Sequence, residues 1–319
     1  MDTLIIEKKN EVYITVDCDP NVQREISEFF TFYVPGYKFM PAFRNRMWDG
    51  KIRLYSQKTK EIYFGLFPYI RAFAEERGYH IVAGKDVEIN NSVDKEIVKK
   101  FSNSLGQKFE ARDYQIDAIY HSLKFNRALL LSPTASGKSF IIYSLIRYYS
   151  HLIKDSSNNR ILLIVPTTSL VEQMYSDFES YGWNVKKNCH RLYSGYSNQT
   201  NKKVLISTWQ SLYKLPKKYF EQFGVVFGDE AHLFKSKSLT EIMTKLEDCK
   251  YRIGLTGTLD GALTHKLVLE GLFGAVNKVT STRKLMDKKQ LSNLVVRCLI
   301  LKHTVENSKM VTSGKYQDE

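Results

Sequence analysis

The sequence predicts an α/β protein in which a parallel sheet, covered by helices on both faces, follows a small α+β domain. Two observations lead to this fold class. From residue 109 onward, short apolar runs alternate with helical patterns, an order that is typical of βαβ units. Before that point, short strand patterns and isolated helices follow one another without this alternation. A chain of 319 residues has room for about two domains.

Residues 1–90 are predicted to form the small α+β domain, and residues 91–108 a polar connector to a second domain at 109–285. Two short strands are expected around a turn at Lys9-Asn10. Further along, alternating apolar and polar residues predict a β-hairpin, and apolar residues at helical spacing predict helices. The expected hairpin strands are Ile52–Tyr55 and Ile62–Phe64, and the expected helices are Asn21–Phe32, Pro68–Gly78 and Asp94–Ser104.

The second domain is predicted to contain five parallel strands that alternate with helices. Because connections between parallel strands cross over through helices, these helices should cover both faces of the sheet. The expected strands are Ala128–Leu131, Ile161–Val165, Val204–Ser207, Val225–Phe227 and Arg252–Leu255. The expected helices are Asp113–Leu123, Gly137–Tyr149, Ser169–Tyr181 and Leu239–Leu246.

The composition excludes several classes of protein. A hydrophobic content of 43% with 13% aromatic residues excludes a disordered chain. The sequence has no apolar stretch long enough to span a bilayer, and its first residues do not follow the pattern of a signal peptide. The four cysteines are far apart and form no C-x-x-C pair, so we expect free thiols in a reducing compartment. These patterns predict a cytoplasmic protein without a membrane partner.

The net charge of +13 indicates a polyanionic partner. The first 110 residues are almost neutral, yet the segment 38–60 has seven basic residues and one acidic residue, Asp49. Its basic residues are expected to contact nucleic-acid phosphates, with Lys38, Arg44, Arg46, Lys51 and Arg53 as the candidates. Five aromatic residues lie among them, namely Tyr33, Tyr37, Phe39, Phe43 and Trp48. Stacking on exposed bases and filling the core of the small domain are equally weighted interpretations of these rings.

A nucleotide site is predicted at Leu129–Ser139, which reads LLLSPTASGKS. An apolar run leads into a loop of small residues directly before a helical pattern. The backbone of such a loop surrounds phosphates, and the helix N-terminus adds its positive end. Lys138 would reach the β- and γ-phosphates of ATP, and the Ser139 hydroxyl would bind Mg²⁺. The remaining nucleotide-binding candidates in the loop are Pro133, Thr134, Ala135, Ser136 and Gly137.

Ser132 stands where the usual phosphate-binding pattern has a glycine. For this stretch alone, an ordinary glycine turn followed by a solvated lysine is therefore the alternative interpretation.

A second chemical feature follows the apolar run Val225–Phe227, where the sequence continues GDEAH. Carboxylates at the C-terminal end of a buried strand lie where an α/β sheet binds its ligands. Asp229 is expected to hold Mg²⁺ through a water molecule, and Glu230 to orient the attacking water and accept its proton. An isolated Asp-Glu pair is more often a solvated helix start. The pair and the Gly-Lys-Ser loop together predict hydrolysis of ATP with Mg²⁺.

Further short stretches occur in a fixed order along the chain: RDYQ at 112–115, VPTTSLVEQ at 165–173, ISTWQ at 206–210 and LTGT at 255–258. With SPTASGKS and DEAH, this set resembles the first, RecA-like motor domain of superfamily 2 DEAH-type helicases over about residues 109–290. The resemblance implies that Gln115 reads the adenine edge, with Arg112 nearby. It also implies that His232 connects the nucleotide site to Thr256 and Thr258, which couple hydrolysis to the DNA groove.

The same resemblance implies a DNA-binding groove with contacts to the sugar-phosphate backbone. The residues implied are Pro166, Thr167, Thr208 and Gln210. Ordinary capping of strand ends is the alternative for the two threonines.

A superfamily 2 motor has a second RecA-like domain that supplies arginines to the γ-phosphate, but only about sixty residues follow Thr258. A helix is expected at Thr282–Gln290 and a strand at Val295–Leu301, and residues 286–319 would begin the linker to that domain. Without such arginines, phosphoryl transfer loses about 10³ to 10⁵ in rate. We therefore expect the chain alone to be weakly active.

Three functions stay open on the sequence. The leading one is a monomeric, ATP-dependent DNA helicase or translocase for forked or branched DNA in recombination and repair, with an RNA–DNA hybrid as a further candidate substrate. The second is the motor portion of a restriction-type translocase, although no nuclease motif of the type P-D…(D/E)-x-K is evident. The third is a DNA-binding module that is switched by bound nucleotide and hydrolyses little ATP on its own.

Overall fold

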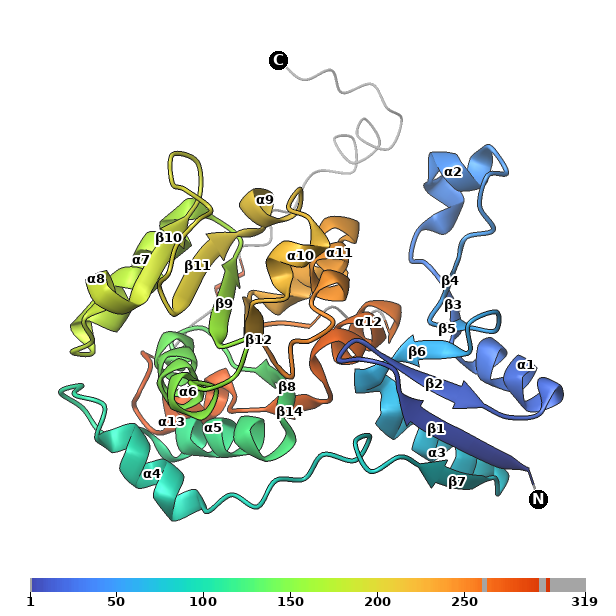
Figure 1. The fold of residues 1–319 in the computed structure, drawn as a ribbon, viewed down its shortest axis with the longest axis horizontal. Coiled ribbons are helices and arrows are strands. Elements are labelled where there is room, and N and C mark those ends of the chain that lie inside the picture. The colour runs from blue at the N-terminus through green and yellow to red at the C-terminus, as the bar shows by residue number, and fades with distance from the viewer. Residues whose placement is uncertain (1, 260–262, 293–296, 299–319) are drawn as a thin grey trace. The chain divides into compact units, whose positions relative to one another are not determined.

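The computed structural model describes residues 2–259, 263–292 and 297–298 (Figure 1). Residues Met1–Thr282 form one compact unit, which contains both the small α+β domain and the parallel sheet, and residues Arg283–Glu319 form a second unit. In the described part of the chain, no helix is both long and apolar enough to cross a membrane.

A parallel sheet forms the centre of the α/β domain, as predicted, and it has seven strands where five were expected (Figure 1). In spatial order its strands are β10 (Cys189–Leu192), β11 (Val204–Thr208), β9 (Arg160–Val165), β12 (Phe223–Asp229), β13 (Tyr251–Thr256), β8 (Arg127–Leu131) and β14 (Val276–Lys278). Strand β13 pairs with both β12 and β8, and Thr256 is level with Leu131. Because the strands are parallel, their C-terminal ends meet at one edge of the sheet.

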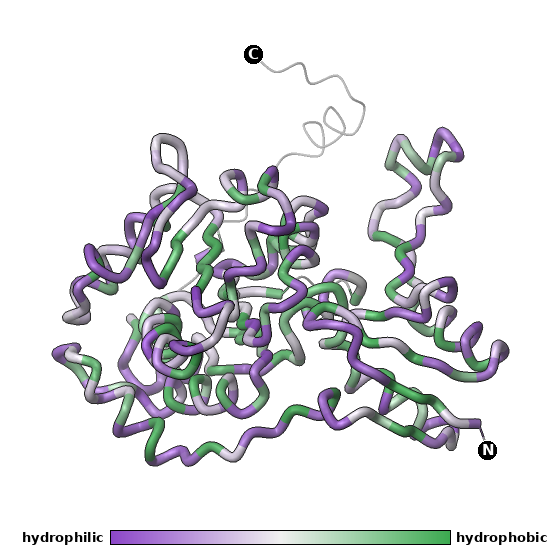
Figure 2. Tube along the Cα trace, viewed as in Figure 1, coloured by the Kyte–Doolittle hydropathy of each residue, from purple (hydrophilic) through white to green (hydrophobic). Residues whose placement is uncertain are grey.

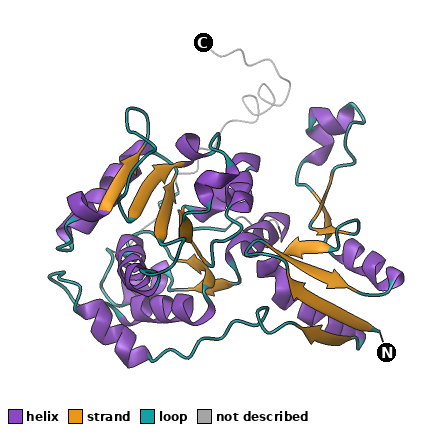
Figure 3. Ribbon diagram, in the orientation of Figure 1, coloured by secondary structure: helices purple, strands orange, loops and turns teal. Residues whose placement is uncertain are grey.

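Helices cover both faces of this sheet (Figure 3). Successive strand residues point to opposite faces, so Leu130 and Leu163 belong to one buried cluster while Leu129 and Leu162 belong to another. The first cluster is closed by α5 (Asp113–Phe125), α6 (Lys138–Leu152) and α7 (Thr168–Ser180). The second is closed by α9 (Trp209–Leu212), α10 (Lys217–Phe220), α11 (Lys237–Lys245) and α12 (Leu263–Phe273).

All five strands and four helices predicted for this domain are present, with ends shifted by a few residues. Six described strands and α-helices of this domain were not predicted: the edge strands β10 and β14, the helix α12 and the one-turn helices α8 (Val185–Asn188), α9 and α10. Both edge strands are short and have half-buried residues, so they lack the continuous apolar run that identified the central strands. The central strand β9, by contrast, is almost wholly hydrophobic (Figure 2).

The small domain is built on a five-stranded sheet with the order β5-β6-β2-β1-β7. Its strands are β1 (Thr3–Lys8), β2 (Tyr13–Asp17), β5 (Tyr55–Ser56), β6 (Glu61–Tyr63) and β7 (His80–Ala83), and its main helices are α1 (Pro20–Phe29) and α3 (Phe67–Arg77). The two strands expected around Lys9-Asn10 and the helix expected at 68–78 are confirmed. The helix expected at Asn21–Phe32 was too long, because Phe30 caps it and Thr31–Tyr33 forms strand β3.

The predicted hairpin was also partly wrong. Tyr55 does pair with Ile62, but Ile52 lies in β4 (Lys51–Arg53) and pairs with Phe32 of β3. Residues 31–53 therefore form an arm, in which β3 and β4 are the stalk and η1 (Tyr37–Phe39) and α2 (Pro41–Arg44) are the tip. Figure 1 shows this arm extending away from the five-stranded sheet.

The connector contains the predicted helix as α4 (Lys95–Asn103), which Asp94 caps with its side chain and which packs against α5. The helix expected at Thr282–Gln290 is the shorter α13 (Thr282–Asp287). The strand expected at Val295–Leu301 falls largely outside the described residues.

Candidate ATP site and nucleic-acid surfaces

The Gly-Lys-Ser loop connects the end of β8 to the start of α6 at Lys138. Gly137 has a φ of 81°, and a Cβ atom there would lie 2.3 Å from Nε2 of Gln115, so only glycine fits. Ser132, which replaces the usual glycine, brings its hydroxyl within 2.6 Å of the Ser136 hydroxyl. Ser136 also donates to the carbonyl of Pro133 at 2.6 Å. Ser132 is thus compatible with a phosphate-binding loop, and its hydroxyl closes the loop internally.

Gln115 and Arg112 lie beside this loop. The Gln115 side chain is buried; its amide donates to the carbonyl of Ser136 at 2.9 Å and accepts from the backbone N–H of Arg112 at 3.0 Å. Tyr114 donates to the same Ser136 carbonyl at 3.2 Å and accepts from the Arg112 guanidinium at 2.8 Å. The structure therefore brings Gln115 to the phosphate loop, and its contact with adenine stays a prediction.

A continuous set of contacts runs from Lys138, the first residue of α6, to the ends of strands β12 and β13. Lys138 Nζ lies 2.8 Å from Glu230 Oε1, and Glu230 Oε2 lies 3.3 Å from His232 Nδ1. The same His232 nitrogen is 3.0 Å from Thr256 Oγ1, which donates to the carbonyl of Thr258 at 2.8 Å. The residues implied to couple hydrolysis to DNA are therefore in direct contact. Their role in coupling remains a prediction.

Asp229 ends the central strand β12, and its side chain is buried. Burial raises the pKa of the carboxyl to about 6, and the positive charge of Lys138 offsets only part of this rise. Its Oδ1 has no hydrogen-bond partner within the described residues. A buried carboxylate oxygen without a hydrogen bond is costly unless a cation binds it, so this strand end fits Mg²⁺.

Ser139, the other predicted magnesium ligand, has a partner that sequence reasoning missed. Its hydroxyl lies 2.9 Å from the hydroxyl of Tyr181, which follows α7 and packs against Phe140 and Phe109. Nothing in the sequence pattern points to Tyr181, because the contact depends on how α7 packs on α6.

Three of the four predicted groove residues come from the ends of β9 and β11, and Gln210 follows in α9. One pocket of about 550 Å³ is lined by all four of these residues, Pro166, Thr167, Thr208 and Gln210, and also by Tyr193. Thr167 also caps α7, since its hydroxyl accepts from the backbone N–H of Leu170 at 3.3 Å. The capping alternative is thus observed for Thr167, and DNA contact stays a prediction.

The arm has almost no core of its own, since Gly50 is its only buried position among residues 31–53. None of the five aromatic rings considered above is among the buried residues of the small-domain core, although Phe32 of β3 packs against that core. Tyr33 stacks on Tyr37 with ring centroids 4.7 Å apart, Tyr37 meets Phe43 edge to face, and Phe39 is 76% exposed. The interpretation of these rings as core residues was therefore wrong.

The basic residues of the arm differ in their surroundings. Lys38, Arg44 and Arg46 are exposed and have no carboxylate within 4 Å among the described residues. Lys51 lies over the ring of Tyr33 at 4.9 Å, and Arg53 forms an ion pair with Asp49. Three unpaired cations on an exposed, ring-bearing arm are suited to a polyanion.

These strand ends define the class of the protein: a RecA-like motor domain of superfamily 2. Residues 108–261 match the family model described as type III restriction enzyme, res subunit, and residues 6–84 match the one described as DNA helicase UvsW, N-terminal. A crystal structure of the UvsW helicase from bacteriophage T4 superposes with a TM-score of 0.78 at 31% identity, covering 87% of this chain and all of that one. The chain belongs to the UvsW family of superfamily 2 helicases.

Two curated relatives extend this comparison. The ATP-dependent DNA helicase uvsW of Enterobacteria phage T4 is 33% identical over 318 residues, which is 96% of this chain and 62% of the relative. The DNA 3'-5' translocase XPB2 of Sulfurisphaera tokodaii is 27% identical over 155 residues, 47% of this chain and 31% of the relative. The chain therefore spans less than two thirds of the length of these relatives.

Proposed function

We propose that this chain is the ATP-binding and DNA-engaging portion of an ATP-dependent DNA helicase or translocase that acts on forked or branched DNA in recombination and repair. The observation that carries the proposal is the set of contacts from Lys138 through Glu230 and His232 to Thr256. These contacts connect Lys138, the proposed phosphate ligand, to the ends of strands β12 and β13. A relative that is named as an ATP-dependent DNA helicase supports the same activity.

In this proposal, the residues of the ATP site act as follows. ATP would replace Glu230 as the partner of Lys138, which leaves the carboxylate of Glu230 free to orient water and accept its proton. Mg²⁺, held by Ser139 and Asp229, would neutralise charge on the phosphates. Gln115 would contact the edge of the adenine base, and Arg112 would lie beside it.

Two surfaces would contact DNA. The pocket of Pro166, Thr167, Thr208 and Gln210 would follow the backbone on which the motor moves, and the arm would supply the second contact that a preference for forks requires. Lys38 and Arg44 are among its candidates because both are exposed. An RNA–DNA hybrid is a further candidate substrate.

The arm is tested by replacing Arg44, Arg46, Lys51 and Arg53 together with alanine and measuring fork binding as a function of salt. Each duplex phosphate contact contributes about 0.9 to the log–log slope, so the slope should fall by up to about four. The matched control replaces four exposed basic residues outside the arm, Arg24, Lys58, Lys85 and Lys100. A slope that is unchanged, with the fold intact by circular dichroism, would exclude phosphate contact by the arm.

The second candidate function is the motor of a restriction-type translocase, which the match of residues 108–261 favours. The third is a nucleotide-switched DNA-binding module. ATPase assays with single-stranded, duplex and forked DNA distinguish the three. Stimulation greatest with forks supports the helicase, stimulation by unbranched duplex alone supports the restriction-type motor, and nucleotide-dependent DNA binding without turnover supports the module.

A further inference from the structure

The N-terminal ends of strands β8 and β13 lie at the edge of the sheet opposite the candidate ATP site, and each carries a buried arginine. Arg127 is the first residue of β8, and Arg252, its partner in register, is the second residue of β13. Both side chains are more than nine-tenths buried. The other ends of the same strands lead to the phosphate loop and to Thr256. A group that holds these arginines therefore holds the strands on which the ATP site is built.

Glu11, in the turn between β1 and β2 of the small domain, is that group. Its carboxylate lies 3.0 Å from Arg127 Nη2, and its backbone carbonyl accepts from Arg127 and, at 3.3 Å, from Arg252. Its own N–H donates to the carbonyl of Glu247 at 2.8 Å. One residue of the small domain thus makes contact with three places in the α/β domain.

The charges around Glu11 are unequal. Arg252 forms no ion pair within 4 Å among the described residues and donates to four carbonyls, those of Met243, Leu246, Leu272 and Glu11. The guanidinium of Arg127 lies 4.3 Å from the ring centroid of Phe64, a face that also attracts cations. Glu11 is therefore the carboxylate that compensates the buried charge of Arg127, and its loss would leave that charge unpaired.

Helix α12 provides a second fixed contact with the small domain. A Cβ atom on Gly65 would lie 1.9 Å from the carbonyl oxygen of Glu270, and one on Gly271 would lie 2.8 Å from Cβ of Tyr63. The two backbones approach this closely because both positions are glycine. The buried carboxylate of Glu270 also accepts from the hydroxyl of Tyr69 at 2.6 Å.

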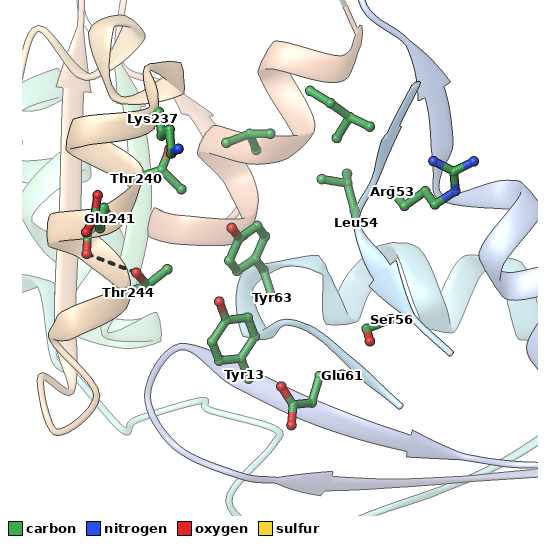
Figure 4. Close-up of a pocket in the computed structure, with 12 residues that line it drawn as sticks. Tyr13, Arg53, Leu54, Ser56, Glu61, Tyr63, Lys237, Thr240, Glu241 and Thr244 are labelled. Atoms are coloured by element: carbon green, nitrogen blue, oxygen red, sulfur yellow. Dashed lines mark hydrogen bonds between the residues drawn. The ribbon is translucent and has the colours of Figure 1, made fainter. Parts of the chain in front are cut away.

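The apolar core is continuous across this boundary, since Ile6 and Ile70 of the small domain belong to the same buried cluster as Leu129 of β8. One stretch of the boundary is open. Figure 4 shows Tyr13 and Tyr63 across a cleft from Thr240 and Thr244 of α11, and the cleft measures about 540 Å³. Beside this shared apolar core, the turn at Glu11 and the glycine contact of α12 are two points at which the backbones of the two domains meet directly.

We infer that Glu11 is a positioning residue, which locks the small domain onto β8 and β13 and so holds the arm at a fixed place relative to the motor. The inference rests on the proposed function in one respect: the arm and the groove are taken to bind one DNA fork together. When the spacing of two linked surfaces is fixed, DNA bound to the first surface meets the second at a high effective concentration. Motion between the two domains would lower this effective concentration. Breaking the lock should therefore weaken fork binding and spare ligands that reach one surface only.

The lock is tested in the 319-residue chain with the variant Glu11→Gln. Spin labels are placed at Glu28→Cys in the small domain and Lys154→Cys in the α/β domain, both exposed, after Cys18 and Cys298 are replaced with serine. The distance distribution should be narrow in the parent and broad in the variant. Fork affinity should fall about tenfold, while affinity for an oligonucleotide too short to reach both surfaces, and for ATP, should not change.

Two further variants make the result decisive. Asp17→Asn is the matched control, since it removes a carboxylate from an exposed ion pair with Lys60 in the same domain, and it should leave every readout unchanged. Gly65→Ala should open the contact with α12 without altering any charge, and it replaces Glu11→Gln if that variant does not fold. A narrow distribution in the folded variants, or a broad one with full fork affinity, overturns the inference. If the parent shows no fork preference, the proposed function fails instead, and the distance distribution alone decides the positioning role.

Discussion

Replacing Glu230 with glutamine should make the protein bind ATP more tightly while it loses turnover. Lys138 is paired with Glu230 at 2.8 Å, so phosphates must compete with a carboxylate for the lysine. The amide of glutamine keeps the shape of the side chain, removes this competition, and also removes a negative charge from beside the phosphates. It cannot accept a proton from water, so hydrolysis should fall by about 10²- to 10⁴-fold.

The size of the gain in affinity follows from the exposure of the pair. Two unit charges about 4 Å apart attract by about 4 kcal/mol at an effective dielectric constant of about 20. The side chains of Lys138 and Glu230 remain 16% and 31% exposed, so solvent screens the pair and desolvation offsets part of the attraction. Exposed ion pairs contribute about 0.2 to 1 kcal/mol. We take about 1 kcal/mol, which corresponds to about fivefold in Kd.

The measurement is calorimetric titration of ATP with Mg²⁺ into the parent and Glu230→Gln, together with ATPase rates in the presence of DNA. Glu247→Gln is the matched control, because Glu247 pairs with Lys217 away from the ATP site. The gain should shrink between about 0.1 M and about 1 M salt, where the Debye length falls from about 10 Å to about 3 Å. Weaker ATP binding by Glu230→Gln, with the control unchanged, would refute the argument that the ion pair opposes nucleotide.

Three further predictions concern the same strand ends and the thiols. Lys138→Ala should abolish ATP binding without lowering the melting temperature, and normal hydrolysis by this variant would exclude the assigned role. Burial raises the pKa of Asp229 to about 6, so in metal-free protein the folded state binds this proton more tightly than the unfolded state, and stability is lost as pH rises from about 4 to about 6. Asp229→Asn should therefore stabilise the metal-free protein at pH 8 by up to about 3 kcal/mol and have little effect at pH 4, as thermal unfolding at both pH values would reveal. Burial also raises the pKa of Cys189 and Cys249 to about 12, so a thiol reagent at pH 8 should modify the exposed Cys298 and reach those two only after unfolding.

Much of the fold could be predicted because the central strands are buried on both faces. Such strands read as unbroken apolar runs, as in β9 and β12, and their order along the chain fixes their helices. The arm could not be predicted, because its strands β3 and β4 have three residues each and pair across a separation of some twenty residues. Alternating apolar and polar residues near Ile52 indicated a hairpin with the strand at Ile62. In the structure, Ile52 pairs instead with Phe32, which is twenty residues away in the sequence.

The candidate ATP site was accessible to sequence reasoning to the extent that its residues lie at strand ends. Lys138 and Glu230 are separated by 92 positions, yet both follow apolar runs, and parallel strands bring such ends together. Tyr181 was not accessible, since its hydroxyl reaches Ser139 through the packing of two helices. The positive φ of 50° at Glu230 could not be predicted either, because a non-glycine residue adopts such a φ only when the surrounding structure imposes it.

In the inference above, the C-terminal ends of β8 and β13 serve the ATP site and their N-terminal ends hold the small domain. This division would explain why two arginines are buried at the N-terminal ends, although burying their charges costs free energy. An apolar pair would be less costly to bury than Arg127 and Arg252. Guanidinium groups, however, can collect several carbonyls and one carboxylate from the turn at Glu11 and thereby specify a single orientation of the small domain. Because those strands lead to the phosphate loop and to Thr256, the same two elements would, in the proposed function, position both ATP and the arm. A purely apolar contact would hold the domains together without fixing that geometry, since it is non-directional.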